Sequence, residues 1–87
     1  MADIIIYTQM LCPYCTRAKK ILQDKGADFE ERDVTMQPAL RAQMREESGG
    51  RNSVPQIFIG ETHVGGCDDL MALDAANELD PLLASVR

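Results

Sequence analysis

Two cysteines, Cys12 and Cys15, are separated by two residues and follow a run of β-forming residues, Ile4 to Thr8. The run predicts a buried strand, and Pro13 fits the first position of a helix, where a backbone N–H would have no partner anyway. Cysteines three positions apart on a helix lie on the same side, with Cα atoms about 5–6 Å apart and within reach of a disulfide. This spacing beside a strand–helix pattern indicates thiol–disulfide chemistry.

The two thiols differ in their predicted environment. With Cys12 as the N-cap and Pro13 next, the Cys12 thiol lies over free backbone N–H groups at the positive end of the helix dipole. Such a setting can lower the pKa of a cysteine from roughly 8.5 to about 3.5–7.5. Cys15 lies inside the first turn, more shielded and farther from the free N–H groups. We therefore expect Cys12 to be the exposed nucleophile and Cys15 the resolving thiol.

A zinc site is an alternative interpretation of the cysteine pair. Zinc would need two further ligands, and only Cys67 and His63 are available. These two residues do not form a second closely spaced motif, so we expect no metal. An inert buried pair is also disfavoured, because the proline-capped position exposes Cys12.

Length and composition indicate one domain, residues 1–87, with a net charge of −5 and three cysteines. The negative charge argues against nucleic-acid binding. An odd number of cysteines that includes a CxxC pair favours a redox motif in a reducing compartment over a secreted disulfide framework. The apolar run from Ile4 to Ile6 is too short for a signal peptide or a membrane span. We expect a cytoplasmic monomer with no nucleic-acid or membrane partner.

The rest of the chain predicts the elements that position the cysteines. The first helix ends at Gly26, and a charged strand over 27–34 suits a sheet edge. Thr35 is a candidate N-cap for a second helix that ends at residues 48–50. A hairpin over 54–59 and 62–64 follows, then a helix whose first turn holds Asp68 and Asp69, with Leu70, Leu73 and Ala76 as its apolar face, and a short closing helix over 80–83. The fold class is α/β, with a four-stranded mixed sheet and helices on both faces, because the first βαβ unit gives parallel strands and the hairpin antiparallel ones.

Three motifs occur in an order that resembles a known family. They are Cys12-Pro13-Tyr14-Cys15, Ser53-Val54-Pro55 and Gly65-Gly66-Cys67-Asp68-Asp69. The chain resembles small dithiol glutaredoxins of the bacterial type over nearly its whole length. The resemblance implies a thioredoxin fold and a glutathione-disulfide oxidoreductase that reduces protein disulfides and protein–glutathione mixed disulfides. Ribonucleotide reductase is one candidate protein partner.

The resemblance also implies a site for glutathione as co-substrate. Tyr14 would flank the tripeptide, the Val54 backbone would pair with it like an added strand, and Pro55 would be cis and face Cys12. The γ-glutamyl end would be held by Gly66, Cys67 and Asp68. Arg41 matches a family position that reaches the glycine carboxylate, and a cation there suits an anion. Gln9 replaces the usual lysine, which removes one cation but leaves a hydrogen-bond donor.

Two other functions fit parts of the pattern. Some glutaredoxins bridge a [2Fe–2S] cluster between two subunits, but Pro13 stiffens the turn and the second thiol competes, which counts against a cluster carrier. A thioredoxin-like donor served by a reductase is the other candidate. Tyr14, together with the segment over 65–68, argues against that interpretation.

Overall fold

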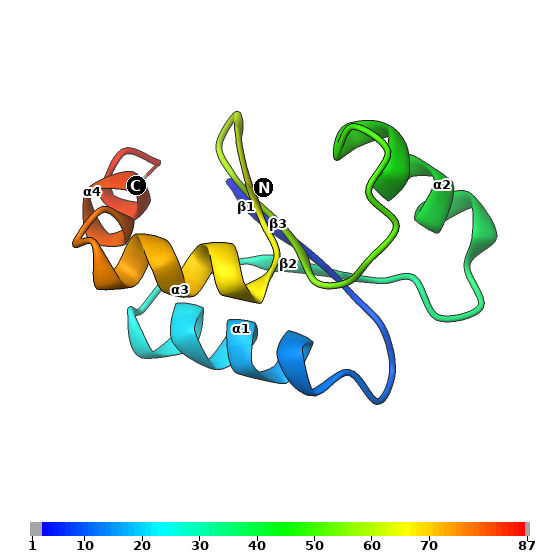
Figure 1. Cartoon of the computed structure of the whole chain (residues 1–87), viewed down its shortest axis with the longest axis horizontal. Coiled ribbons are helices and arrows are strands. Elements are labelled where there is room, and N and C mark those ends of the chain that lie inside the picture. The colour runs from blue at the N-terminus through cyan, green and yellow to red at the C-terminus, as the bar shows by residue number, and fades with distance from the viewer. Residues whose placement is uncertain (1–2, 87) are drawn as a thin grey trace.

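A computed structural model describes residues 3–86, and its elements are shown in Figure 1. They are β1 (Ile4–Thr8), α1 (Pro13–Asp24), β2 (Glu30–Asp33), α2 (Pro38–Glu47), β3 (Gln56–Ile59), β4 (Thr62–Gly65), α3 (Cys67–Ala75) and α4 (Leu79–Ala84). The sheet has the order β2-β1-β3-β4. β1 pairs parallel with β2, whereas β1–β3 and β3–β4 are antiparallel. The predicted mixed sheet and its order of elements are therefore confirmed.

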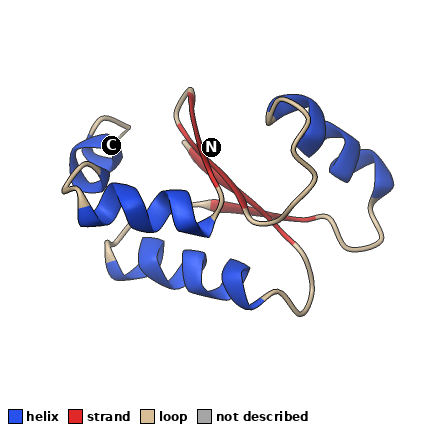
Figure 2. Cartoon of the chain, viewed as in Figure 1, coloured by secondary structure: helices blue, strands red, loops and turns tan. Residues whose placement is uncertain are grey.

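The side chains of β1 alternate between two cores, one on each face of the sheet. Ile4 and Ile6 join the larger cluster, to which α1, α3 and α4 contribute, with Leu22 and Leu70 among its members. Tyr7 faces the other way, into a smaller cluster under α2 that is centred on Tyr7, Val34 and Met44. Figure 2 shows the helices on both sides of the strands. This arrangement is the thioredoxin fold that was expected.

Several predicted details of the elements are wrong. β2 covers only Glu30–Asp33 and not 27–34, although it does lie at the sheet edge. Thr35 is not the cap of α2, because Gln37 holds the N-cap position and Pro38 follows it. The turn places Met36 at φ 53°, and the Thr35 hydroxyl accepts the Met10 N–H. Ala76 lies beyond the last residue of α3 as its exposed C-cap, so it is not part of the apolar face.

The sequence signals at the ends of α1 and α2 are confirmed. Gly26, at φ 70°, follows the C-cap of α1, and Ser48 is the C-cap of α2. The predicted start of the third strand is wrong, because β3 covers Gln56–Ile59 and not 54–59, and Val54 and Pro55 precede it. Within residues 3–86, no helix combines the length and the apolar character needed to cross a membrane.

Candidate active site

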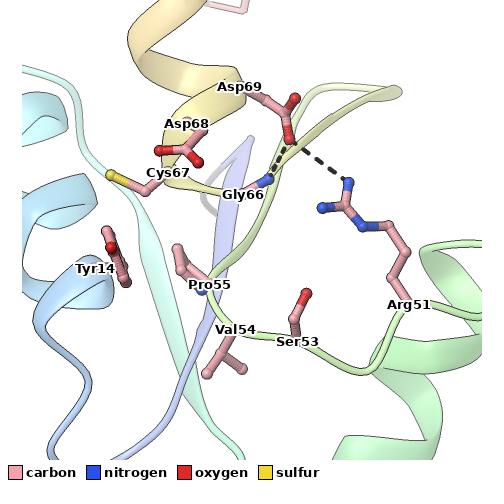
Figure 3. A pocket seen from close by; sticks show the side chains of 9 residues that line it. All are labelled: Tyr14, Arg51, Ser53, Val54, Pro55, Gly66, Cys67, Asp68 and Asp69. Carbon is pink, nitrogen blue, oxygen red and sulfur yellow. Dashed lines mark hydrogen bonds and ion pairs between the residues drawn. The ribbon is translucent and has the colours of Figure 1, made fainter.

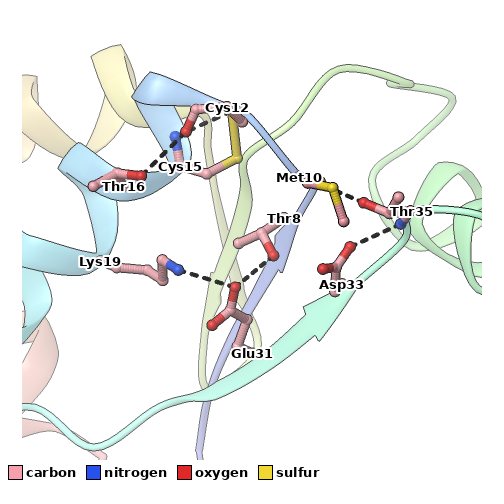
Figure 4. Close-up of polar contacts among 9 residues, drawn as sticks. All are labelled: Thr8, Met10, Cys12, Cys15, Thr16, Lys19, Glu31, Asp33 and Thr35. Atoms are coloured by element: carbon pink, nitrogen blue, oxygen red, sulfur yellow. Dashed lines mark hydrogen bonds and ion pairs between the residues drawn. A yellow bond between two sulfur atoms is a disulfide. The ribbon is translucent and has the colours of Figure 1, made fainter.

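Cys12 is the N-cap of α1, with Pro13 in the first turn, as the sequence predicts. Its backbone is extended, and the Cys15 N–H donates to Cys12 Sγ over 3.1 Å. The two cysteines form a disulfide with their Cα atoms 5.2 Å apart, within the predicted range. Figure 4 shows this disulfide at the start of α1. Cys15 is only 2 % exposed, whereas Cys12 is partly exposed, so the predicted difference in exposure is confirmed.

The segment before β3 lies against the cysteine pair. The Val54–Pro55 peptide bond is cis, as the resemblance implies. The Val54 carbonyl oxygen is 3.9 Å from Cys12 Sγ. Two segments that are about forty residues apart in sequence therefore meet at one sulfur atom.

A groove of about 350 Å³ is formed by the turn of α1, the segment before β3 and the start of α3. Figure 3 shows its lining, with Tyr14 on one side and Arg51 on the other. The lining residues are Tyr14, Arg51, Ser53, Val54, Pro55, Gly66, Cys67, Asp68 and Asp69. The structure thus brings together Tyr14 and the five residues expected from the segments before β3 and at the start of α3.

Gln9 and Arg41 were predicted in the same site, but they do not line this groove. They contact each other instead, because Arg41 Nη2 donates to Gln9 Oε1 over 2.6 Å. Arg41 Nη1 also donates to the Asn52 carbonyl over 2.9 Å and to Asn52 Oδ1 over 3.1 Å. Asn52 precedes Ser53, which does line the groove. Arg41 therefore connects α2 and the β1–α1 loop to the edge of the groove.

Arg51, Ser53 and Asp69 line the groove although the sequence analysis gave them no role in the site. Asp69 Oδ2 accepts the Gly66 N–H over 2.8 Å and lies 3.6 Å from Arg51 Nη1. An acidic residue at the third position of a helix is a known capping signal and could have identified Asp69. The Arg51 contact has no such local signal, because it joins a loop to a helix far along the chain.

Gly65 makes this close arrangement possible. Its φ of +112° lies in a region that favours glycine, and a Cβ there would overlap the Asp69 carboxylate and lie 2.9 Å from Arg51 Nη1. The glycine lets the backbone pass directly under the ion pair. It therefore helps to hold Arg51 over the start of α3.

A buried glutamine supports the wall of the groove. Gln56 is 0 % exposed, and its Nε2 donates to the Ser53 carbonyl over 2.9 Å and to Ser53 Oγ over 3.2 Å. Its Oε1 lies 2.8 Å from His63 Nε2. Burial, and after it the charge of Arg51, lower the pKa of His63, while Asp69 opposes the shift. The shift favours the neutral imidazole, and the tautomer with its proton on Nε2 donates that proton to Gln56 Oε1.

The third cysteine has a different environment from the CxxC pair. The Cys67 side chain is buried at the start of α3. Burial raises the pKa of its thiol, with a smaller opposing effect from Arg17 and a further increase from Asp68. Across residues 3–86, no three His, Cys, Asp or Glu side chains gather closely enough to hold a metal ion.

A CxxC pair at a helix start, next to the cis Val54–Pro55 peptide bond of a thioredoxin fold, defines a thiol–disulfide oxidoreductase. A comparison with protein families identifies the family within this class of oxidoreductases. The Glutaredoxin family model matches residues 4–64, and the chain belongs to the glutaredoxin family.

Three relatives illustrate the match. Glutaredoxin from Pseudomonas aeruginosa is 54 % identical over 85 residues, covering 98 % of this chain and all of the relative. The solution structure of glutaredoxin from Brucella melitensis is 57 % identical with a TM-score of 0.84, covering all of this chain and 94 % of the other. The crystal structure of a buckwheat glutaredoxin–glutathione complex is 29 % identical with a TM-score of 0.87, covering 98 % of this chain and 79 % of the other.

Proposed function

We propose that this chain is a glutathione-dependent oxidoreductase that reduces protein disulfides and protein–glutathione mixed disulfides. The observation that carries the proposal is the groove between Tyr14, Val54 and the start of α3, beside the cysteine pair. It offers an aromatic side chain that is 56 % exposed, the Val54 backbone and a helix N-terminus in one place. A relative of the same fold was crystallised with glutathione.

Each part of glutathione has a proposed contact. The γ-glutamyl carboxylate accepts hydrogen bonds from the backbone N–H groups of Cys67 and Asp68, because the start of the helix favours an anion. The Asp68 carboxylate pairs with the ammonium group. The tripeptide pairs with the Val54 backbone like an added strand and lies next to Pro55 and Tyr14.

The glycine carboxylate is assigned to Arg41 and Gln9 at the edge of the groove. Arg41 uses one nitrogen on Gln9 and another on Asn52. A guanidinium carries five N–H donors, so further donors remain for a carboxylate. Gln9 also keeps its amide N–H groups, because its oxygen is the atom that contacts Arg41.

The proposed reaction on a glutathionylated protein has two exchanges. The Cys12 thiolate attacks the glutathione sulfur, the bond to the protein sulfur breaks, and the protein leaves as a thiolate that takes a proton from water. A second glutathione thiolate then attacks the Cys12-bound glutathione, releasing glutathione disulfide and the Cys12 thiolate. Each exchange breaks one S–S bond and forms another.

A protein disulfide requires Cys15 as well. Cys12 attacks one sulfur and the other leaves as a thiolate; Cys15 then loses its proton and attacks Cys12 Sγ, which frees the substrate and closes the Cys12–Cys15 disulfide. The closed pair is the state seen in the structure. Glutaredoxin potentials of roughly −200 to −230 mV lie close to the cytosolic glutathione pool, so the reaction runs in either direction.

The remaining parts of the proposal concern the setting. We assign a single-domain monomer in the cytoplasm, with glutathione as co-substrate and no metal. Its partners are disulfide-bonded or glutathionylated proteins, with ribonucleotide reductase as one candidate. The reducing compartment agrees with a chain whose function depends on thiols being regenerated.

Two cysteine variants test the proposal. Cys15→Ser should retain removal of glutathione from a mixed disulfide, because that route uses only Cys12. Cys12→Ser should abolish it. An active Cys12→Ser protein would overturn the assignment of the nucleophile.

A comparison of reductants tests the dependence on glutathione. The oxidised protein should be reduced by glutathione with glutathione reductase, and poorly by thioredoxin reductase. The opposite preference would identify a thioredoxin-like donor instead. Both assays use the same disulfide-bonded protein, so the comparison does not depend on a variant that folds differently.

A further inference from the structure

A second groove opens at the same cysteine pair, and glutathione has no assigned contact in it beyond Gln9. It has a volume of about 530 Å³ and is lined by residues of β1, the β1–α1 loop, α1 and β2. Figure 4 shows Thr8, Lys19 and Glu31 below the disulfide, with Asp33 farther along β2. Cys12 and Cys15 line this second groove themselves, whereas the first groove comes near the pair through Val54, whose carbonyl oxygen is 3.9 Å from Cys12 Sγ.

An apolar rim borders this second groove. We define the rim as Met10, Leu11 and Met36, whose exposed fractions are 64 %, 94 % and 94 %. Met10 and Leu11 line the groove directly. Met36 belongs to the neighbouring loop, which is tied to the first because the Met10 N–H donates to Thr35 Oγ1 over 2.7 Å. Large apolar side chains that gather at an exposed site are typical of a surface that another molecule covers.

The backbone holds two rim residues in an uncommon conformation. Leu11 has φ 59° and Met36 has φ 53°, in the left-handed region that glycine, asparagine and aspartate tolerate best. Glycine, asparagine or aspartate would be less strained than leucine or methionine at these positions and would expose less apolar surface. A role for their side chains outside the fold would explain them.

The floor of the second groove is polar but largely paired. Glu31 Oε2 accepts the Thr8 hydroxyl over 2.7 Å and lies 3.1 Å from Lys19 Nζ. Hydrogen bonds from the Thr35 hydroxyl and backbone N–H lower the pKa of Asp33, with a smaller contribution from the charge of Lys19. The lining carries one cation against the two carboxylates of Glu31 and Asp33, so it repels an acidic occupant.

Disulfide exchange dictates what can reach this surface. When the Cys12 thiolate attacks a protein disulfide, the S–S bond breaks, the departing sulfur leaves as a thiolate, and a Cys12–sulfur bond of about 2.05 Å forms. With a glutathionylated protein, the departing cysteine is only one S–S bond farther away. In both cases the residues next to the substrate cysteine contact the protein surface around Cys12. Glutathione takes the first groove, which leaves the second groove and its rim for the polypeptide.

We infer that the second groove and its apolar rim bind the polypeptide segment that carries the substrate cysteine, and that they favour apolar over acidic neighbours of that cysteine. This inference rests on the proposed function, because it assigns the non-glutathione part of the same substrate. Small disulfides that carry no polypeptide make no contact with the rim. The rim therefore sets the choice among protein substrates and leaves the chemistry at Cys12 unchanged.

The double variant Leu11→Asn/Met36→Asn tests the inference. Asparagine tolerates the left-handed backbone, so the variant keeps the fold while it loses the apolar surface. Three substrates are compared: a glutathionylated peptide with leucines beside its cysteine, the same peptide with aspartates there, and the mixed disulfide of glutathione with 2-mercaptoethanol. The wild type should prefer the leucine peptide. The variant should lose about tenfold in kcat/KM on that peptide, as expected for partial loss of apolar burial.

The other two substrates separate this inference from the proposed function. The variant should turn over the mercaptoethanol mixed disulfide as well as the wild type does, and Met71→Gln, which removes a half-exposed methionine on α3, should match the wild type on all three substrates. Failure of the wild type on the mercaptoethanol mixed disulfide would refute the proposed function. An unchanged leucine preference in the variant, or an equal loss on all three substrates, would refute the role of the rim alone. A wild-type dimer in sedimentation that the variant dissociates would assign the rim to a second copy of the chain and likewise overturn the inference.

Discussion

The backbone N–H of Cys15 donates a hydrogen bond to Sγ of Cys12, with 3.1 Å between nitrogen and sulfur. The sulfur occupies the N-cap of α1, where the first backbone N–H groups have no partner within the helix. A hydrogen bond to the charged form of a group favours that form. In the reduced protein this contact therefore stabilises a thiolate on Cys12.

The first prediction concerns the titration of Cys12. We expect its thiol to ionise at a lower pH than a free cysteine, whose pKa is roughly 8.5. The ultraviolet absorbance of the thiolate in Cys15→Ser measures this, with Cys12→Ser as the control. Burial raises the pKa of Cys67, so its step should come at higher pH. A Cys12 step at the position of a free cysteine would show that the N-cap does not activate the sulfur.

The second prediction separates the two neighbouring carboxylates of α3. Asp69 accepts the Gly66 N–H, so Asp69→Ala should lower the free energy of unfolding by about 0.5–2 kcal/mol, as for the loss of a helix cap. Asp68→Ala should leave stability nearly unchanged but raise the KM for glutathione by about tenfold, through loss of the proposed ammonium contact. Urea unfolding and steady-state kinetics measure the two effects. If Asp68→Ala lowers stability and Asp69→Ala raises the KM, Asp68 is the cap and Asp69 the glutathione contact.

The third prediction concerns Arg41. Arg41→Lys keeps the positive charge but cannot bridge Gln9 and Asn52 at the same time. We expect the KM for glutathione to rise roughly fivefold, since at least one net hydrogen bond of about 1 kcal/mol is lost. Gln9→Ala removes one acceptor of Arg41 and one neutral amide donor but leaves the guanidinium in place, so it should have a smaller effect. If neither variant changes the KM, the glycine carboxylate does not bind at this edge of the groove.

The fourth prediction concerns stability at high pH. Burial and, after it, the hydrogen bond to Glu47 raise the pKa of Tyr7, and Arg32 opposes the shift. The folded state therefore holds the Tyr7 proton more tightly than the unfolded state, where the pKa is about 10. The resulting stability is complete below about pH 10 and is lost as pH rises through the folded-state pKa.

Tyr7→Phe tests this dependence. The variant should be less stable than the wild type near neutral pH by about 1–2 kcal/mol, because Glu47 and Arg32 each lose a hydrogen-bond partner. Above pH 10 the difference should shrink, because the variant has no phenol to ionise at this position. Urea unfolding across the pH range provides the measurement. A gap that stays constant at high pH would mean that Tyr7 does not titrate differently on folding, and a gap that widens would mean that folding lowers its pKa.

Local signals predicted most of the fold and the cysteine geometry. The isoleucines of β1 and the proline after Cys12 specify a strand and a helix start from neighbouring residues alone. Gly26 and Ser48 likewise end their helices as the sequence indicates. In these places propensity, capping and packing favour the same structure.

The details that could not be predicted depend on contacts between distant segments. Thr35 has the residue type of an N-cap, but Met10 and Asp33 engage its hydroxyl and backbone N–H instead. The Arg51–Asp69 ion pair joins a loop to a helix, and only the folded chain brings the two together. Arg41 was expected in the groove, yet its contacts lie on Gln9 and Asn52 at the edge.

The most direct test of the account is to trap glutathione on the protein. Cys15→Ser is treated with glutathione disulfide, digested, and mapped by mass spectrometry. The account predicts one glutathione, bound to Cys12, which reduced glutathione then removes as glutathione disulfide. An adduct on Cys67 in its place, or a protein that glutathione disulfide does not modify, would contradict the central claim that Cys12 is the nucleophile of a glutathione-dependent site.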